Sequence, residues 1–263
     1  MSRKLSSAGA KARRAFLPAA VCVVWSAMGA VAAAPPPPIV HLCDLGEATA
    51  AELGRERLLA ALGIEKEAFI ACTGGALAAP GAPPAERAAC AAALAAAVPF
   101  DVVNLAHRDL AGDPAALAEA IGRAGVRFVS ASFRLPAGRD TPWKDFVVVT
   151  RGGVATAFVG IAVRAPSMEL PDAGVVPGLQ FVEPGAAIAA AVPKAAAAAD
   201  AVVILADADP ADAAAWAASS PKVRAVIVSG RGGGARDFAP ERKIFLSPPG
   251  GGAAAAIVFD AAG

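Results

Sequence analysis

The sequence predicts an α/β fold in which two β-sheets stack against each other between outer helices. Residues 100–133 read as strand, loop, helix and strand, which is one parallel βαβ unit. Residues 146–163 hold two β-rich segments joined at Gly152-Gly153, which is typical of an antiparallel hairpin. A second βαβ-like series runs from 186 to 229. Two such halves, each ending in a polar loop, favour a two-sheet sandwich.

Before residue 100 the chain predicts two strand–helix pairs. The strands are the short apolar runs Ile39–Cys43 and Phe69–Cys72, and the helices are expected at Ala48–Leu62 and Pro84–Ala97. Each strand leads into a polar or glycine-rich loop. Because open α/β sheets bind ligands at the carboxyl ends of their strands, these loops are candidate parts of a site.

The βαβ unit itself begins with a strand at Val102–Leu105. Its helix is predicted to start at Pro114, with Asp113 as the cap, because proline is favoured at the first helical position. Gly125 marks the end of that helix, and Val126–Ala131 is the next strand. The unit therefore delivers the loop after its first strand to the carboxyl edge of a sheet.

The rest of the chain continues the alternation of strands and helices. Strands are expected at Phe146–Thr150, Val154–Val163, Leu179–Val182, Ala201–Leu205, Arg224–Ser229, Ile244–Leu246 and Ala255–Phe259, and helices at Ala186–Ala199 and Asp209–Ala218. Pro193 predicts an interruption or a kink in the first of these helices, because proline cannot donate the helical hydrogen bond.

Residues 1–32 have the pattern of an export signal. Basic residues precede the apolar segment Phe16–Ala27, and Ala30-Val31-Ala32 is a small-residue cleavage motif. Arg13-Arg14 also matches a twin-arginine signal, with the general secretory route as the alternative. The apolar segment is too short for a stable membrane span. We expect cleavage near Ala32 and a periplasmic or other extracytoplasmic location.

Cleavage at that point changes the charge balance. The chain has 24 basic and 23 acidic residues, and residues 1–32 hold five basic and no acidic ones, which leaves 19 basic against 23 acidic. This balance, without a basic patch interleaved with aromatic residues, gives no support to a nucleic-acid partner, and we expect none. We expect a Pro-rich spacer at 33–38 and a single domain at 39–263, which is long enough for one sizeable core.

Several stretches resemble the catalytic domain of the bacterial periplasmic 5′-nucleotidases, in the calcineurin-like metallophosphoesterase superfamily. IVHLCDLGE resembles its first strand and Asp-x-His motif, and FDVVNLAHRDLAGDPAALAEAIGRAGVRFVSASF resembles the stretch that begins at its Gly-Asn-His-Glu motif. WKDFVVVTRGGVATAFVGIAV resembles its hairpin, and KIFLSPPGGGAAAAIVFDAAG its closing strands. ADAVVILADAD and VRAVIVSGRGGG stand where its last histidine motifs occur. The resemblance implies a four-layer sandwich of two mixed sheets flanked by helices.

The sequence departs from this resemblance at the family's two-metal site, which consists of Asp, His and Asn side chains. Asp44 is retained. The departures are Gly46 for a His, Gly74-Gly75 for Gly-Asp, Ala106-His107-Arg108-Asp109 for Gly-Asn-His-Glu, Asp207 for a His, and Gly230-Arg231-Gly232-Gly233 for Gly-His-x-His. The substitutions predict that the standard two-metal centre is lost.

Four residues at these positions remain candidate ligands for one divalent metal: Asp44, His107, Asp109 and Asp207. Carboxylate and imidazole groups suit a range of divalent metals. The alternative is that Asp44 and Asp109 cap neighbouring helices and pair with Arg108. An active phosphoester hydrolase with an altered metal site is one functional hypothesis.

Cys43 and Cys72 are candidate catalytic thiols, since each lies at the carboxyl end of a predicted strand beside a former ligand position. The neighbouring strands of the resembled fold would bring both thiols to one cleft, and the amides of Thr73-Gly74-Gly75 would favour the reactive thiolate. Redox chemistry of a thiol or selenol type is therefore a second hypothesis. A structural disulfide or two buried thiols is the alternative.

Arg108, Arg231 and Gly232 are candidate anion-binding residues, because guanidinium groups and glycine-rich turns both suit oxyanions. The alternative is a mobile glycine loop with a solvated arginine. The sequence thus predicts an exported protein of the metallophosphoesterase fold that has lost its two-metal centre. It would serve as a binding or thiol-bearing module for a small anion or a protein partner.

Overall fold

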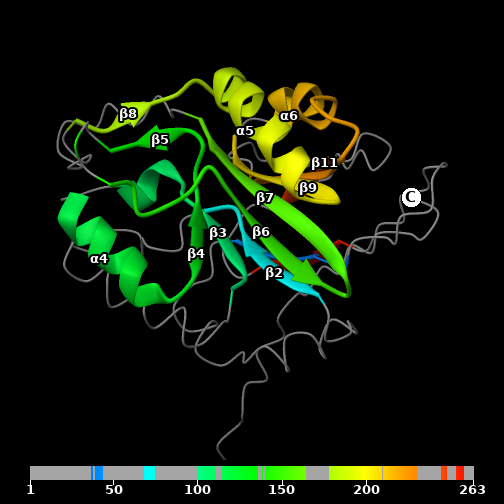
Figure 1. The fold of residues 1–263 in the computed structure, drawn as a ribbon, viewed down its shortest axis with the longest axis horizontal. Helices are drawn as coiled ribbons and strands as arrows, with labels where there is room; N and C mark the ends of the chain where they lie inside the picture. The colour runs from blue at the N-terminus through cyan, green and yellow to red at the C-terminus, as the bar shows by residue number, and fades with distance from the viewer. Residues whose placement is uncertain are drawn as a thin grey trace, which may run out of the picture.

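The computed structural model describes residues 37, 39–43, 68–74, 100–110, 114–135, 138, 140–163, 178–208, 210–229, 244–247 and 253–257. The predicted export signal, the helices at Ala48–Leu62 and Pro84–Ala97, and most of the spacer lie outside these ranges. The described residues build two stacked sheets and the helices beside them (Figure 1). This arrangement confirms the predicted sandwich.

Sheet 1 has the strand order β12-β1-β2-β3-β4 in the described part of the chain. Its strands are β1 (Ile39–Cys43), β2 (Phe69–Cys72), β3 (Val102–Asn104), β4 (Arg127–Val129) and β12 (Ala253–Ile257). Strands β1 to β4 run parallel, and β12 runs antiparallel to β1. The predicted βαβ unit is confirmed: between β3 and β4 the chain forms a 3-10 helix, η1 (His107–Leu110), and α4 (Pro114–Ala124).

Sheet 2 has the strand order β11-β10-β9-β7-β6 among the described residues. Its strands are β6 (Phe146–Arg151), β7 (Val154–Ala162), β9 (Ala201–Asp207), β10 (Val223–Ser229) and β11 (Ile244–Ser247). The hairpin of β6 and β7 turns at Gly152 and Gly153, which both have positive φ, as the predicted two-residue turn requires. A two-stranded sheet of β5 (Phe133–Arg134) and β8 (Gln180–Phe181) lies beside them.

The two large sheets pack face to face, and alternation along the strands decides which side chains meet. One buried cluster combines Phe69 and Val102 of sheet 1 with Phe158, Val203 and Leu205 of sheet 2. Phe69 and Phe158 meet edge to face, with 5.2 Å between ring centroids. Because successive strand residues point to opposite faces, the residues between these positions face outward, towards the helices.

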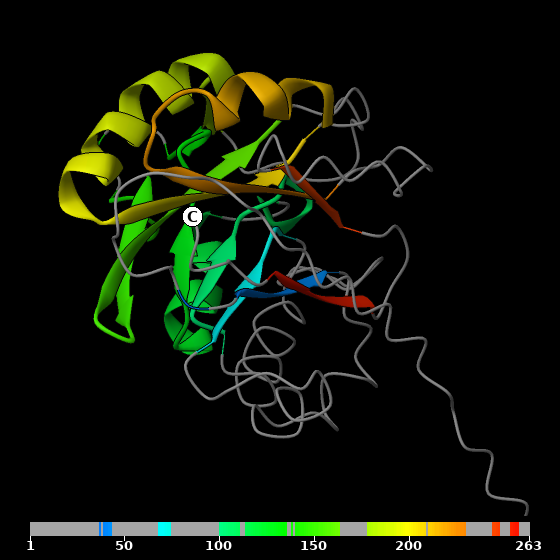
Figure 2. The same cartoon turned by 90° about the vertical axis from the view of Figure 1, so that its right-hand side faces the viewer.

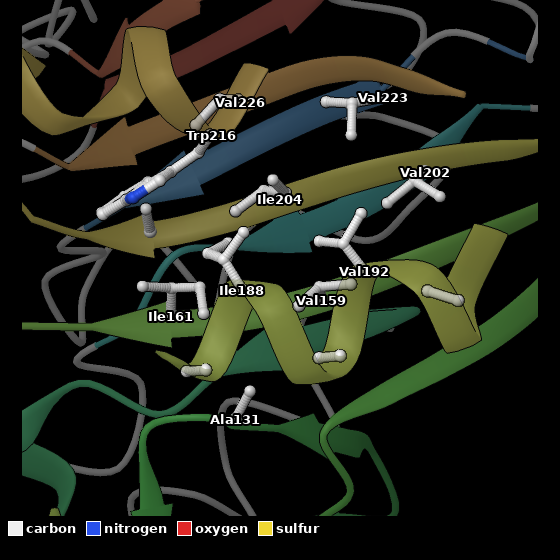
Figure 3. Close-up of a cluster of buried hydrophobic side chains, with 14 of the residues drawn as sticks. Ala131, Val159, Ile161, Ile188, Val192, Val202, Ile204, Trp216, Val223 and Val226 are labelled. Carbon is white, nitrogen blue, oxygen red and sulfur yellow. The ribbon is translucent and has the colours of Figure 1, made fainter. Parts of the chain in front are cut away.

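Helices α5 (Pro184–Ala198) and α6 (Pro210–Ala217) cover the outer face of sheet 2 (Figure 2). Ile188 and Val192 of α5 point onto strands β7 and β9, and Trp216 of α6 lies beside Val226 of β10 (Figure 3). α4 lies beside β4, on the opposite side of the molecule (Figures 1 and 2). Helices therefore flank the sheets on both sides, as a four-layer sandwich requires.

Of the interruption or kink predicted at Pro193, the interruption is wrong. α5 continues through Pro193 from Pro184 to Ala198. Both Pro193 and Ala189, the residue four positions earlier, are exposed, so water can hydrate the carbonyl group that loses its helical donor. The buried side of α5 keeps its apolar contacts with sheet 2, and these contacts hold the helix together.

An ion pair ties the sheets together at the edge opposite the carboxyl ends of the parallel strands. The guanidinium of Arg151 donates to Oδ1 of Asp101, whose side chain is only 8% exposed. Oδ2 of Asp101 accepts a hydrogen bond from the backbone N–H of Ile70 at 2.8 Å. Arg151 also lies over the ring of Phe69, 5.7 Å from its centroid. These contacts fix the β6–β7 hairpin against sheet 1.

Candidate functional site

Two predicted site residues, one from the helix η1 that follows β3 and one from β9, come together at the carboxyl edge. His107 begins η1, three residues after the end of β3 at Asn104, and Asp207 is the last residue of β9. Nδ1 of His107 lies 3.9 Å from Oδ2 of Asp207, and the two side chains are 15% and 13% exposed. Such a pair, partly shielded from water, is an ion pair when the imidazole is protonated.

The position of Asp207 follows from the central place of β9 in sheet 2. Asp207 pairs with Ala162 of β7, and its carbonyl accepts a hydrogen bond from the N–H of Val163 at 2.9 Å. The apolar residues before it are all buried, so the strand stays in the sandwich until the carboxylate reaches the edge. The backbone of Asp207 is thus fixed against β7, and Ala206 before it also pairs with Val228 of β10.

Asp109 supports the turn that carries His107. Its side chain is buried, and Oδ2 accepts a hydrogen bond from the N–H of Ala106 at 2.8 Å. The N–H of Asp109 in turn donates to the carbonyl of Ala106 at 3.0 Å. This reciprocal pair resembles a capping box, and it closes η1 at its first turn. The structure therefore gives Asp109 the capping contact that the sequence suggested as the alternative to metal ligation.

Cys72 is buried and contacts its own loop. Its thiol donates to the carbonyl of Gly74, two residues later in the chain, at 3.4 Å. The sulfur also accepts a hydrogen bond from the N–H of Gly74 at 3.5 Å. Phe69 and Ala71 face the core between the sheets. Because side chains alternate between the two faces along a strand, Cys72 lies on the outer face of sheet 1. In the register of β1 and β2, Cys72 pairs with Leu42 and not with Cys43, whose side chain lies outside the described part.

Asn104 is a site residue that the sequence interpretation missed. It is fully buried on the inner face of sheet 1, and its Nδ2 donates to the carbonyls of Thr73 at 2.8 Å and Ile161 at 2.9 Å. Its side chain thereby joins β3 to the end of β2 and to β7 of the other sheet. The signal in the sequence is one amide within the apolar run Val102–Leu105. An amide in such a run must find hydrogen-bond partners inside the protein.

Ser229 was also missed as a candidate. It ends β10 beside β9, where Val228 pairs with Ala206, so it stands at the level of Asp207. Its hydroxyl donates to the carbonyl of Ala206 at 3.3 Å. A polar residue that closes an apolar strand is the sequence signal for such a position.

Gly74 brings the loops after β2 and β3 into direct contact. Its φ is +135°, a conformation that residues with a side chain rarely adopt, and a Cβ there would lie 2.5 Å from Cβ of Ala106. Gly74 allows the loop of Cys72 to lie against the turn that leads to His107.

The remaining predicted residues are only partly described. Asp44, Arg231 and Gly232 lie outside the described residues, and for Cys43 and Arg108 only the backbone is described. Within the described ranges, no three His, Cys, Asp or Glu side chains gather closely enough to hold a metal ion. The structure thus brings together His107 and Asp207, and it leaves the contributions of the others as predictions.

Solved structures with similar folds include calcineurin-like phosphoesterases and 5′-nucleotidases. The calcineurin-like phosphoesterase YfkN from Bacillus subtilis matches with a TM-score of 0.60 and 14% identity, over 82% of this chain and 81% of that one. The 5′-nucleotidase precursor from Thermus thermophilus matches with a TM-score of 0.57 and 17% identity, over 85% and 48%. The chain has the metallophosphoesterase fold. NAD nucleotidase (NadN) from Haemophilus influenzae also matches, with a TM-score of 0.57 and 14% identity, over 74% and 38%.

This chain therefore spans less than half the length of the two nucleotidases, although it covers most of YfkN. No protein-family model and no curated protein sequence matches it. The likeness consequently lies in the fold, and the chemistry of the site must be argued from this chain's own residues. In the part of the chain that the structure describes, no helix has the length and apolar character needed to cross a membrane.

Within the described residues, the candidate donors are too few for the two-metal centre that the resemblance implies. Of the candidate ligands, His107 and Asp207 converge, while Asp109 is buried in a backbone contact. At positions that the resemblance aligns with metal ligands, the sequence has Gly46, Gly75, Gly233 and Arg231, which offer no side-chain ligand for a cation. Two divalent ions need more oxygen and nitrogen ligands than these residues supply.

Proposed function

We propose that this protein is a metallophosphoesterase-fold binding module that does not carry out two-metal hydrolysis. The observation that supports it is that most of the described polar side chains at the carboxyl edge form hydrogen bonds with the protein backbone, which leaves few of them as metal ligands. Asn104, Asp109, Cys72 and Ser229 all make hydrogen bonds to backbone groups of the fold. Among the described candidate ligands, His107 and Asp207 alone form a pair across the two sheets.

The ligand that best suits this edge is a small phosphate-bearing compound. The names of similar structures, a 5′-nucleotidase and an NAD nucleotidase, indicate nucleotides as the class to test first. A protonated His107 and the arginines Arg108 and Arg231 would supply positive charge to such an anion. Asp207 would hold the imidazole and would accept a hydrogen bond from a ligand hydroxyl.

Elemental analysis and calorimetric titration of the purified mature protein test this proposal. We expect well below one equivalent of transition metal, no hydrolysis of bis(p-nitrophenyl) phosphate, and saturable binding of AMP or inorganic phosphate. His107→Gln and Asp207→Asn should weaken that binding, whereas Asp212→Asn on the exposed side of α6 should not. Two metal equivalents with phosphatase turnover would contradict the proposal, and so would the absence of binding to both probes.

A hydrolase with one metal ion is the second candidate, and the meeting of His107 and Asp207 favours it. One carboxylate and one imidazole, with Asp44 as a third donor, would hold a single divalent ion. This candidate predicts one metal equivalent and slow phosphodiester hydrolysis that both His107→Gln and Asp207→Asn abolish. Turnover that survives both substitutions would exclude it.

Thiol redox chemistry is less well supported by the structure, because Cys72 is buried and its sulfur contacts Gly74. We expect Cys72 to react with a thiol reagent only after unfolding. A comparison of Cys43→Ser, Cys72→Ser and Cys90→Ser variants of the mature protein would assign any accessible thiol. Rapid reaction of Cys72 in the folded protein would restore the redox hypothesis.

We also propose that the protein is exported. The support is the basic and apolar pattern of residues 1–32 with its cleavage motif. N-terminal sequencing of the protein recovered outside the cytoplasm should begin near Ala33. Replacing Arg13 and Arg14 together by Lys should block export only if the twin-arginine route is used.

A further inference from the structure

Asn104 holds three chain segments together at the carboxyl edge. As the last residue of β3, it donates to the carbonyl of Thr73 at 2.8 Å and to the carbonyl of Ile161 at 2.9 Å. The first carbonyl belongs to the loop after β2, and the second belongs to β7 in the opposite sheet. Because both acceptors are carbonyls, they require the amide nitrogen and so fix the orientation of the side chain.

These three segments lead directly to His107 and Asp207. His107 follows Asn104 by three residues on the same loop, and Ile161 pairs with Ala206, the residue before Asp207. The loop of Thr73 continues to Gly74, which packs against Ala106, the residue before His107. Asn104 therefore connects the backbone under one member of the pair to the backbone under the other.

The amide oxygen of Asn104 does not connect chain segments in the way that the amide nitrogen does. Oδ1 of Asn104 is buried without a hydrogen-bond partner among the described residues. A Cβ on Gly160 would lie 2.5 Å from this oxygen, so the absence of a side chain on β7 provides the space for it. An unpaired buried acceptor is costly, and the two donor contacts are the reason an amide is tolerated there.

We propose that Asn104 is a positioning residue that sets the separation of His107 and Asp207 by clamping the two sheets at their carboxyl edges. The proposal rests on the same pair as the proposed function. The positioning role concerns the geometry of the protein without ligand, so its test is independent of ligand binding. Asn104 can lack this role although AMP or phosphate binds, and it can have this role although neither binds.

The test uses the imidazole signal of His107 in the protein labelled with ¹³C-histidine. The chain contains two histidines, so His107→Gln identifies the Cε1–Hε1 cross-peak of His107. Asp207→Asn removes a carboxylate 3.9 Å from Nδ1 and should shift this peak. We expect Asn104→Ala to reduce that response to Asp207→Asn by about threefold or more, because the pair separates.

Asp101→Asn is the matched control. Asp101 is also buried, and it ties the sheets together at the opposite edge. It should lower stability while leaving the response of His107 to Asp207→Asn unchanged. A full response in the Asn104→Ala background would overturn the proposal. Loss of the response in the Asp101→Asn background would do the same, because it would show that general loosening suffices.

Gly160→Ala is the second route if Asn104→Ala does not fold. The added methyl group pushes on Oδ1 of Asn104 and on the carbonyl of Val129, which its Cβ would approach to 2.5 Å. We expect the same loss of the His107 response, with circular dichroism confirming a folded protein. A folded Gly160→Ala protein with the full response would also overturn the proposal.

Discussion

The contribution of a single residue to the stability of this protein depends on the groups in direct contact with it. Asp101 is an instructive case, because its carboxylate accepts from the N–H of Ile70 and from the guanidinium of Arg151. A buried carboxylate in water-poor surroundings requires such partners. Removing the charge leaves Arg151, which is a quarter exposed, without its counter-ion.

We predict that Asp101→Asn lowers the free energy of unfolding by about 2 kcal/mol, because a largely buried ion pair loses one partner. Urea denaturation followed by circular dichroism measures this change. Glu119→Gln is the control, since Glu119 and Arg123 are more than half exposed and should contribute about 0.5 kcal/mol or less. Equal effects of the two substitutions would show that the ion pair at Asp101 does not stabilise the sandwich.

Gly160, which is tightly surrounded, and Gly122, which has open space around it, give a second prediction for single residues. Gly160→Ala should destabilise by about 2 kcal/mol or more, because its Cβ would lie 2.5 Å from the carbonyl of Val129. Gly122→Ala in α4 should stabilise by about 0.5–1 kcal/mol, because nothing lies within 4 Å of its Cβ and alanine favours the helix. Thermal unfolding of both variants gives the sign directly, and a stabilising Gly160→Ala would contradict the packing described for Asn104.

At the scale of the element, burial overrides local propensity in α5. The helix has proline in its interior and no side-chain cap at Glu183, yet it extends over 15 residues. Its apolar side, with Ile188 and Val192, packs on β7 and β9. At its end, Nζ of Lys222 donates to the carbonyls of Ala196 and Ala199, which satisfies groups that the helix itself leaves unpaired.

We predict that Pro193→Ala raises the free energy of unfolding by about 1 kcal/mol. The substitution restores the N–H donor to the carbonyl of Ala189 on the exposed side, and part of the gain is offset because proline also restricts the unfolded chain. Lys194→Ala, the neighbouring exposed position, serves as the control and should change stability by less than about 0.5 kcal/mol. A loss of stability in Pro193→Ala would mean that the proline assists packing.

Across the whole molecule, the two sheets share one core and should not unfold separately. The inner cluster takes Phe69 and Val102 from one sheet and Phe158 and Val203 from the other. The contacts of Asn104 and Asp101 join the sheets at opposite edges. The halves that the sequence presents in succession are therefore one cooperative structure.

We predict a single unfolding transition in urea, with coincident curves from far-ultraviolet circular dichroism and from tryptophan fluorescence. Trp143 and Trp216 are both buried and report on different parts of the fold. Trp143→Phe and Trp216→Phe variants should each show the same midpoint by both methods. Two separated transitions would indicate that the sheets form independent folding units.

Much of the fold could be predicted from the sequence because its signals are local. The apolar runs predicted β1 and β2 to the residue, and the glycine pair predicted the hairpin. β5 was missed because two residues paired with Gln180 and Phe181 give no periodicity of their own. The continuity of α5 through Pro193 depends on its packing against β7 and β9, and a local sequence pattern does not show such contacts.

For the site, the sequence by itself determined which chemical groups are present. It has glycine or arginine at most positions that the resemblance aligns with metal ligands, and it predicted His107 in the loop after one strand and Asp207 at the end of another. Only the tertiary structure decided that these two side chains lie 3.9 Å apart, that Cys72 is buried against Gly74, and that Asn104 joins the sheets. The physical reason is that the His107–Asp207 and Asn104–Ile161 contacts link residues far apart in the chain, so strand pairing and sheet stacking set them. The burial of Cys72 likewise depends on the segments packed around β2 and not on its local sequence.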